Sequence, residues 1–422
     1  MLAVDARAVC CHSCHKSGVT ARFREAPLKV LVFSTLYPNA AQPNFGIFVE
    51  NAVRRVADAG VETRVIAPNG VPPWPLSRHP RYAAVAALPR QETWRGLAVE
   101  RPRFPLLPAL GWRLNPRLIA RAGAAALRQL MDEGFVPDVI DAQFFYPCGV
   151  AAVAVARQFD LPVTLKARGS DIAFWGRRPA ARRAMLEAAR QVDSLTAVSA
   201  ALRAEMVALG MAAQDIAVHY TAVDLERFAA GDRAAARASH GFTRPTILSV
   251  GSLTDVKDHA LLIRAVALVP DADLAIAGHG PLRASLEQLA ASLGLGERVR
   301  FLGNIAHDAL PALYQAADVF ALTSKREGLA NVWLESLACG TPLVITPVGG
   351  AREVVDRPEA GRVVEERTPE AVAAALRAVL AAPLPREAVR ACAERFTWQR
   401  HVETKLDILR ETIARHRRRA AG

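Results

Sequence analysis

Residues 319–346 read VFALTSKREGLANVWLESLACGTPLVIT, with an apolar run, a polar loop, an amphipathic run and a second apolar run in succession. The run VFALTS predicts a β-strand, which the loop KREG follows. A helix is expected from about Leu329 to Cys339, because Gly340 and Pro342 are residues that end a helix. The run PLVIT predicts the next strand, so the stretch indicates a βαβ unit of a parallel sheet.

The same alternation recurs along the chain, for example where FVENAVRRVADAG precedes ETRVIAP. Two sheets fit 422 residues better than a single core does. The expected fold class is α/β, with two domains built on parallel sheets and a cleft between them. The expected strands are LKVLVFST (28–35), ETRVIAP, DVIDAQ, PVTLKA, LTAVS and IAVHYT in the first domain, and PTILSVGS, LAIAG, VRFLG, VFALTS and PLVIT in the second.

The domain boundaries are predicted from stretches without a strand pattern. Residues 225–245 are charged and rich in Ala and Gly, so the junction is placed near residue 222. The last helix has apolar residues on one face, at Val402, Leu406, Leu409 and Ile413. The predicted parts are a disordered extension at 1–27, a first domain at 28–221, a second domain at 222–397, a helix at about 398–415 and a basic tail at 416–422.

Composition and charge limit the function classes. Half of the residues are hydrophobic and 22% are charged, which is typical of a globular protein with a buried core. No apolar run reaches the roughly 18 residues that span a bilayer, and the N-terminus lacks a secretory pattern, so a cytoplasmic location is expected. The formal net charge is +12, and residues 1–240 hold +10 of it (30 Lys+Arg minus 20 Asp+Glu). A basic first half fits nucleic acid, anionic lipid or a phosphorylated substrate.

Two motifs have the spacing of metal sites and are interpreted otherwise. Cys11-x-x-Cys14-His15 matches haem attachment and half of a zinc site, but the remaining cysteines are scattered singly and no export signal is present. Asp271 and Asp273 form an Asp-x-Asp pair before the strand LAIAG. Open parallel sheets bind ligands beyond the carboxyl ends of their strands, whereas this pair lies at an amino end. No metal site and no cofactor is therefore predicted.

Glu327 and Glu335 lie eight residues apart, the first before the predicted helix and the second within it. Along a helix axis they are roughly 12 Å apart at about 1.5 Å per residue, which is wider than the about 5–10 Å of a hydrolytic acid/base pair. The backbone amides at the helix start can bind phosphate, and Gly328 lets a ligand approach them. The two carboxylates are interpreted as groups that bind hydroxyls at two ends of one ligand. The alternative is that Glu327 caps the helix and Glu335 faces water.

The same stretch resembles a family signature of the form E-G-x-x-N-V-x-x-E-x-x-A-C-G-x-P. This is the Glu-x7-Glu signature of the retaining glycosyltransferases of family 4. The likeness extends over nearly all of residues 28–415 and includes STLYPNAAQPNFGIFVENAVRRV, LKARGSDI, VGSLTDVKDHALLIRAV and GHGPLRASLEQLAASLGL. It implies the GT-B architecture, in which two Rossmann-like domains face each other across a cleft. The second domain then holds the nucleotide sugar, the first holds the acceptor, and the C-terminal helix packs back on the first domain.

The resemblance also implies a role for each matching residue. Glu327 contacts hydroxyls of the donor sugar, and Glu335 contacts the ribose hydroxyls. The amides of Gly328, Leu329 and Ala330 contact the sugar and the diphosphate. The remaining donor-binding candidates are Gly46, Gly251, Ser252, Lys257 and Asn331.

The cations of the expected site depart from the family pattern. Lys257 matches a lysine that meets the diphosphate, but Ser252 stands where the family often has arginine, so one cation is missing. Arg168 takes the place of a histidine found in many relatives and is a candidate for that cation, although it cannot act as a proton-transfer base. The catalytic candidates are therefore Glu327, Lys257 and Arg168. Two structural alternatives stay open, a solvated loop lysine at 257 and an Arg168–Asp171 pair that fixes its loop.

The predicted function is retaining transfer of a hexose-type sugar from a UDP- or GDP-linked donor to an acceptor hydroxyl, with no cofactor and no metal. The basic first domain, the RRPAARR run (177–183) and the RHRRR run (415–419) favour a lipid-diphosphate acceptor in surface polysaccharide assembly, at the anionic inner face of a membrane. A small soluble acceptor is the alternative. A nucleic-acid-binding protein does not account for the Glu-x7-Glu helix, and a non-catalytic sugar-binding protein would need an export signal.

Overall fold

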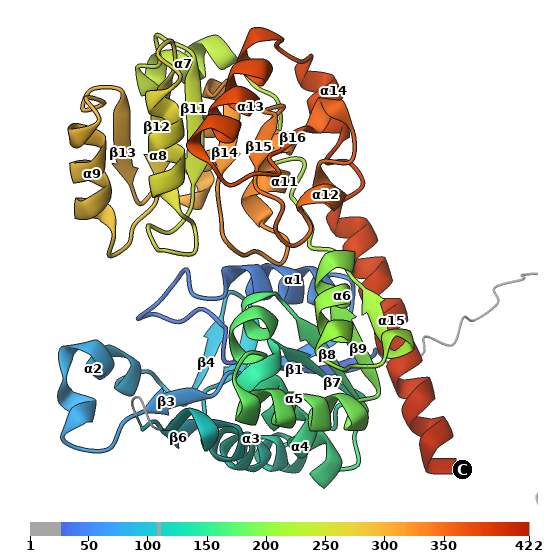
Figure 1. Cartoon of the computed structure of the whole chain (residues 1–422). Helices are drawn as coiled ribbons and strands as arrows, with labels where there is room; N and C mark the ends of the chain where they lie inside the picture. The colour runs from blue at the N-terminus through green and yellow to red at the C-terminus, as the bar shows by residue number, and fades with distance from the viewer. Residues whose placement is uncertain (1–26, 108–110, 422) are drawn as a thin grey trace, which may run out of the picture.

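The computed structural model describes residues 27–107 and 111–421. Two parallel sheets, each with helices on both faces, form two domains that lie one above the other in Figure 1. The predicted α/β class is therefore confirmed. The expected extension at 1–27, with Cys11, Cys14 and His15, falls almost entirely outside the described residues.

The first sheet has the strand order β10-β9-β8-β7-β1-β2-β5-β4, and only β4 is antiparallel to its neighbour. All six strands expected for this domain are present, whereas the hairpin of β4 and β5 and the small β3–β6 ladder were not expected. The strands are β1 (Lys29–Phe33), β2 (Glu62–Ile66), β3 (Asn69–Val71), β4 (Gln91–Trp94), β5 (Leu97–Glu100), β6 (Arg103–Pro105), β7 (Val139–Gln143), β8 (Val163–Ala167), β9 (Ser194–Ala197) and β10 (Ile216–Val218).

The second sheet has the order β13-β12-β11-β14-β15-β16 and is parallel throughout. The five expected strands are present, and β16 extends the sheet by one strand that was not expected. The strands are β11 (Thr246–Val250), β12 (Asp273–Ala277), β13 (Val299–Gly303), β14 (Val319–Leu322), β15 (Leu343–Ile345) and β16 (Gly361–Val363).

The helices cover both faces of each sheet because the buried strands are apolar on both sides. In β1, Leu31 and Phe33 pack against α3 and α4, while Val30 and Val32 pack in a second cluster with α1 and α15. The helices are α1 (Ile47–Asp58), α2 (Pro80–Ala86), α3 (Asn115–Asp132), α4 (Val150–Gln158), α5 (Pro179–Gln191), α6 (Ala200–Ala208), α7 (Arg233–His240), α8 (His259–Ala267), α9 (Arg283–Ser292), α10 (Leu310–Ala316), α11 (Asn331–Ala338), α12 (Ala351–Val354), α13 (Pro369–Ala381), α14 (Arg386–Ala391) and α15 (Trp398–Ala421).

Helix α15 leaves the second domain and runs down the side of the first (Figure 1). Its predicted apolar face packs with strands and α1 of the first domain, and Leu409 is fully buried there. The helix continues to Ala421, so the separate basic tail expected at 416–422 is wrong. Arg415 and Arg418 pair with Glu411, and Arg419 pairs with Asp193, so two carboxylates compensate part of this positive charge within the chain.

The chain leaves the first sheet after β10 and enters the second at β11, with α7 between them. None of the helices in the described part of the chain is both long and apolar enough to cross a bilayer.

Candidate functional site

A cleft lies between the two domains, where the carboxyl ends of both sets of strands meet. From the first domain it is lined by residues that follow β7 and β8, including Phe144 and Arg168. From the second domain it is lined by Gly251 and Lys257 after β11 and by residues 326–332 after β14. The structure therefore brings together most of the residues that the sequence analysis selected.

Glu327 and Lys257 form an ion pair inside this cleft. Lys257 Nζ lies 2.5 Å from Glu327 Oε1, and the Ser324 hydroxyl donates to the same oxygen at 2.7 Å. Glu327 does not cap α11, whose first turn has no side-chain cap. Lys257 is not a solvated loop lysine, since only 21% of its side chain is exposed. A fixed cation and a fixed carboxylate thus meet where the resemblance places the diphosphate and the sugar.

Helix α11 begins at Asn331, two residues later than predicted, and its start faces the cleft. Among the described contacts the amides of Leu329 and Ala330 have no acceptor, as expected of groups that precede a first helical turn. Packing between the domains requires glycine at position 328, whereas the sequence analysis expected this glycine to let a ligand approach the amides. A Cβ atom at this position would lie 2.1 Å from the carbonyl oxygen of Arg168, so the backbone of the first domain fills the space that a side chain would need.

Glu335 is buried within α11, so the alternative that it faces water is wrong. The Tyr314 hydroxyl donates to Glu335 Oε2 at 3.0 Å, and His307 Nε2 lies 3.1 Å from Oε1. Burial, followed by the nearby Glu335 charge, raises the pKa of Tyr314, which keeps its hydroxyl protonated. The carboxylate is therefore held in one orientation.

The two carboxylates line neighbouring hollows. Glu327 lines the cleft itself, and Glu335 lines an adjoining hollow together with Asn51 and Arg54 of α1. The two hollows share Phe48, Thr221, Asn331 and Val332 as walls. The two carboxylates therefore line adjoining hollows, and their binding to two ends of one ligand stays a prediction.

Arg168 projects from the loop after β8 and is held by the first domain. Its guanidinium donates to Gln143 Oε1 at 2.5 Å and lies 4.9 Å from the ring centroid of Phe48. Asp171 accepts hydrogen bonds from the backbone amides of Arg168 and Gly169 and is not paired with the guanidinium, so that alternative is wrong. Burial lowers the pKa of Arg168 to about 10, and the group remains a cation near neutral pH.

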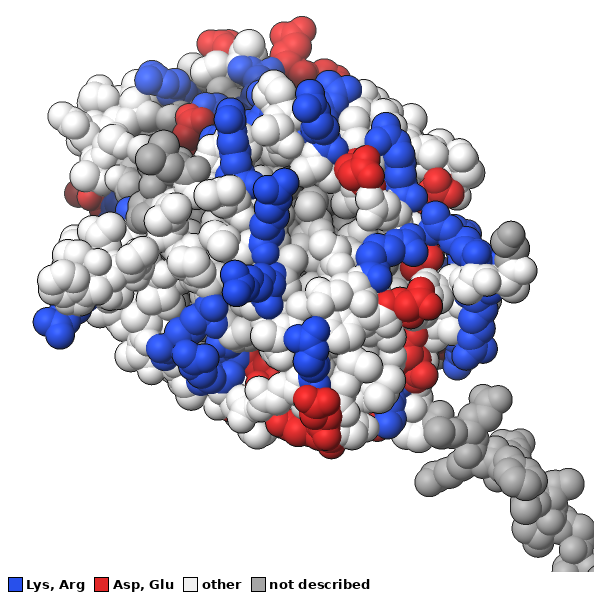
Figure 2. All heavy atoms as spheres, turned by 90° about the horizontal axis from the view of Figure 1, so that it is seen from below, with Lys and Arg blue, Asp and Glu red and all other residues white. Residues whose placement is uncertain are grey.

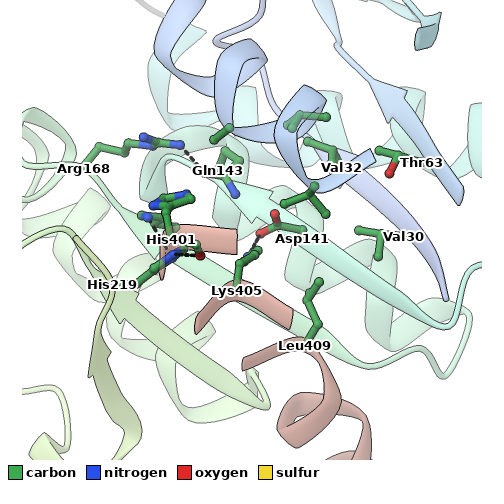
Figure 3. A pocket seen from close by; sticks show the side chains of 14 residues that line it. Val30, Val32, Thr63, Asp141, Gln143, Arg168, His219, His401, Lys405 and Leu409 are labelled. Atoms are coloured by element: carbon green, nitrogen blue, oxygen red, sulfur yellow. Dashed lines mark hydrogen bonds and ion pairs between the residues drawn. The ribbon is translucent and has the colours of Figure 1, made fainter. Parts of the chain in front are cut away.

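A buried polar network lies behind Arg168 and beneath α15 (Figure 3). Lys405 of α15 pairs with Asp141 at 2.7 Å, and Lys166 Nζ lies 2.9 Å from His219 Nδ1. His219 stacks on His401 with the ring centroids 4.0 Å apart. Burial is the largest cause that lowers the pKa of Lys166 and of both histidines. Helix α15 is thereby connected to β8, the strand that directly precedes Arg168.

The remaining candidates have mixed outcomes. Gly251 and Ser252 line the cleft, and Asn331 lines it while its side chain accepts from the Thr221 hydroxyl at 3.0 Å. Gly46 is not among the lining residues. It precedes α1 with a φ of 75°, and a Cβ there would lie 2.5 Å from the carbonyl of Leu36, so backbone packing alone requires glycine.

Three residues of the site were missed from the sequence. His307 and Tyr314 orient Glu335 from 28 and 21 residues away, and no local pattern marks them. Arg326 lines the same cleft as Ser252, directly before Glu327, and adds a further cation to its lining. Arg326 could have been selected from the sequence, because it lies in the KREG loop directly before Glu327.

The Asp-x-Asp pair lies at the amino end of a strand, where the sequence placed it. Asp273 is the first residue of β12, and its carboxylate pairs with Arg244 at 3.0 Å. Within residues 27–107 and 111–421 no three His, Cys, Asp or Glu side chains are grouped as metal ligands would be.

Comparison with known proteins identifies relatives of both domains. Residues 46–227 match the family described as Glycosyltransferase Family 4, and residues 232–396 match the family described as Glycosyl transferases group 1. The chain is 30% identical to D-inositol 3-phosphate glycosyltransferase 1 of Catenulispora acidiphila, over 94% of this chain and 98% of that one.

Other similarities cover less of the relative or have lower identity. The chain is 34% identical to the GDP-mannose-dependent alpha-(1-6)-phosphatidylinositol monomannoside mannosyltransferase of Mycolicibacterium smegmatis, over 50% of this chain and 58% of that one. It spans about half the length of several further curated relatives. Sucrose-phosphate synthase from Thermosynechococcus elongatus superposes with a TM-score of 0.77 at 20% identity, over 92% of this chain and 100% of that one, which shows a common fold.

Proposed function

Because the chain belongs to glycosyltransferase family 4 and has the GT-B fold, we propose that it transfers a hexose-type sugar from a nucleotide sugar to an acceptor hydroxyl with retention of the anomeric configuration. The observation that carries this proposal is the placement of Glu327 and Lys257 in the cleft, directly before the free amides of α11, with Glu335 fixed in the adjoining hollow.

The donor lies along α11 with its diphosphate at the helix start. Lys257, Arg168 and Arg326 supply positive charge to the diphosphate from both domains, together with the amides of Leu329 and Ala330. Glu327 then binds hydroxyls of the sugar, and Glu335 binds the ribose. Because fixed side-chain cations supply the positive charge, the proposal needs no metal ion and no cofactor.

Transfer breaks the bond between the anomeric carbon and the diphosphate oxygen and forms a bond from the same carbon to the acceptor oxygen. The leaving phosphate takes the acceptor proton on the face from which it departs, so the configuration is retained. The protein positions both substrates and stabilises the charge that develops on the nucleoside diphosphate. In this account Glu327 is not a nucleophile.

The nucleotide is UDP or GDP in this proposal. The name of the Mycolicibacterium smegmatis relative gives GDP-mannose as its donor, which supports a GDP-linked sugar. The same name gives a phosphatidylinositol mannoside as the acceptor, which supports a lipid-linked acceptor here. Because the first domain is also basic, the lipid-linked acceptor that we favour is a lipid-diphosphate-linked glycan in surface polysaccharide assembly, at the inner face of a membrane.

A small soluble acceptor is the second candidate. The Catenulispora acidiphila relative is named for D-inositol 3-phosphate, and the alignment covers nearly the whole of both chains. A phosphorylated polyol would suit the unusually basic first domain as well as a lipid diphosphate does.

A two-stage experiment tests the function. A thermal-shift screen over UDP-, GDP-, ADP- and TDP-sugars is expected to show stabilisation by one nucleotide class, and this donor is then supplied in radiolabelled form. Label that enters the organic phase of a membrane extract supports the lipid acceptor, and label that enters a soluble phosphorylated polyol supports the alternative. Absence of both stabilisation and transfer with every donor would contradict the proposal.

A further inference from the structure

The arginines of the first domain lie in stretches of sequence that lack acidic residues. No Asp or Glu occurs in residues 63–91, 101–131 or 172–186. Figure 2 views the molecule from the side of the first domain and shows Lys and Arg spread over this surface, with fewer Asp and Glu. The excess of charge is therefore local to one part of the molecule.

Large apolar side chains are exposed within these same stretches. Trp74 is 74% exposed, and Leu76 and Leu107 are also exposed. Strands β3 and β6 are parallel neighbours, so the chain leaves both at the same end, and the amide of Leu106 donates to the carbonyl of Val71. Trp74 and Leu107 thus belong to segments that start side by side. An exposed tryptophan and leucines in one region are unusual for a surface that meets only water.

A group of aromatic rings around an arginine includes Trp112, which follows Leu107 closely in the chain, where the amide of Gly111 donates to the carbonyl of Leu107. The Arg178 guanidinium lies 5.2, 4.6 and 4.8 Å from the ring centroids of Trp112, Phe174 and Trp175. The neighbouring Arg113 lies 5.1 Å from the ring centroid of Trp112. Phe174 is 43% exposed and also lines the cleft, so the group reaches the mouth of the candidate active site.

The arginines of this surface lack carboxylate partners. In the part of the chain that the structure describes, Arg113, Arg177 and Arg178 form no ion pair, whereas Arg190, at the far end of α5, pairs with Glu187. The arginines of the α15 terminus are likewise mostly paired. Free guanidinium groups beside exposed aromatic rings suit a partner with phosphate groups above an apolar phase.

We propose that this docking face, defined by Trp74, Leu76, Leu107, Arg113, Phe174 and Arg178, binds the surface of an anionic phospholipid bilayer. The apolar side chains enter the interface between headgroups and acyl chains, and the arginines bind the phosphates. Because Phe174 borders both the face and the cleft, docking places the cleft mouth at the headgroup level. The proposal rests on the proposed lipid-linked acceptor and names the surface that brings the enzyme to it.

Flotation of the full chain with vesicles tests the docking face without any turnover. Vesicles of phosphatidylcholine alone are compared with an equal mixture of phosphatidylcholine and phosphatidylglycerol. One variant pair is Trp74→Ser with Leu76→Ser, and the other is Arg113→Gln with Arg178→Gln. Each pair is expected to weaken partition to the mixed vesicles by about tenfold or more, because the first pair loses apolar side chains that enter the interface and the second loses charges that bind phosphate. High salt is expected to weaken the wild type in the same direction.

Matched controls come from the second domain, where exposed leucines and unpaired arginines also occur. Leu268→Ser with Leu293→Ser, and Arg264→Gln with Arg362→Gln, are expected to float like the wild type. Equal flotation of the docking-face variants and the wild type would overturn the proposal. A second result would also overturn it: the wild type binds a single-stranded oligonucleotide more tightly than it binds the vesicles, and the arginine pair of substitutions abolishes this oligonucleotide binding.

Donor binding in the same preparations separates this proposal from the proposed function. Stabilisation by a nucleotide sugar without flotation overturns the docking face and leaves the glycosyltransferase standing. Flotation that depends on the docking face, without any donor binding, supports the face and contradicts the function.

Discussion

At the scale of single residues, the carboxylates of Glu327 and Glu335 have different surroundings. Their removal is therefore expected to change nucleotide affinity and turnover in different ways. Glu335 is buried between Tyr314 and His307, so Glu335→Ala is expected to weaken the binding of bare nucleoside diphosphate by about tenfold or more, the value of one charged hydrogen bond. Glu327→Ala frees Lys257 for the diphosphate, so affinity for the bare nucleotide is expected to stay equal or increase while turnover falls. Titration calorimetry with nucleotide and with nucleotide sugar measures both.

Tyr314→Phe is the control for this comparison, because it removes the hydroxyl that orients Glu335 and keeps the carboxylate. Its affinity for the nucleotide should lie between those of the wild type and Glu335→Ala. Equal loss of bare-nucleotide affinity in Glu327→Ala and Glu335→Ala would contradict the assignment of the two carboxylates.

Arg168 depends on Gln143 for its orientation, since their side chains meet at 2.5 Å. Arg168→Ala is expected to lower kcat/KM by more than tenfold, which corresponds to about 1.4 kcal/mol. Gln143→Ala is expected to lower it by a smaller factor with little change in Tm, because the arginine remains but is less well oriented. Gln129→Ala on the surface of α3 is the control. A loss below tenfold in Arg168→Ala would contradict a role of its guanidinium in the reaction.

At the scale of elements, the buried strands were predictable and the edge strands were not. The runs KVLVF of β1 and VFAL of β14 are almost wholly apolar, and β7 and β11 are fully buried with three apolar residues each, so their pattern is strong. Strand β16 has three residues, and β4 alternates half-buried and exposed positions, so neither has a comparable run. Arg95 and Gly96, with φ of 47° and 88°, form the two-residue turn of the β4–β5 hairpin, and the X-Gly pair was a usable signal.

For the candidate site, too, only the residues that belong to a local sequence pattern could be predicted. Glu327, Gly328 and Glu335 lie in one short motif, and the motif could be recognised within one helix and its loop. His307, Tyr314 and Gln143 reach the site from separate elements, and only the packing of α10 and β7 brings them there. Contacts of this kind depend on tertiary structure and leave no periodic pattern in the sequence.

The contact between α15 and the first domain should make stability depend on pH. His219 and His401 are buried, and burial lowers the pKa of each well below 6.5. Below about pH 6.5 the unfolded chain binds protons that the folded chain does not, so the free energy of unfolding falls as the pH falls, by about 1.4 kcal/mol per pH unit for each histidine. Chemical denaturation at pH 7.5, 6.5 and 5.5 measures this slope.

His401→Gln is expected to flatten the slope by the share of one histidine. His279→Gln, at an exposed position of the second domain, should leave the slope unchanged. If the slope is unchanged in His401→Gln, the loss of stability at low pH is caused by protonation of groups other than His401.

At the scale of the whole molecule, the site exists only while the domains are in contact. Arg168 comes from the first domain, and Lys257 and Glu327 come from the second. The two sides touch at Gly169 and Gly328, where a Cβ on Gly169 would lie 2.7 Å from the Gly328 Cα. The relative position of the domains therefore determines whether cations from both sides can reach one diphosphate.

Glu353 of α12 links the domains beside this contact. Its carboxylate accepts from the amides of Ala200 and Ala201 at the start of α6, at 2.7 and 2.9 Å, and from the Tyr220 hydroxyl at 2.9 Å. An acidic group at a helix start is stabilised by both the free amides and the helix dipole.

Glu353→Ala is expected to shift the open and closed populations by about tenfold toward the open form, because hydrogen bonds to a charged group contribute roughly 1.5–3 kcal/mol. Small-angle X-ray scattering should then give a larger radius of gyration, and saturating nucleotide sugar should reduce it again. Glu365→Ala, which breaks an exposed ion pair with Arg352 within the second domain, should leave the scattering curve unchanged. Identical curves for Glu353→Ala and the wild type would mean that the contact at Gly328 holds the domains closed without this link.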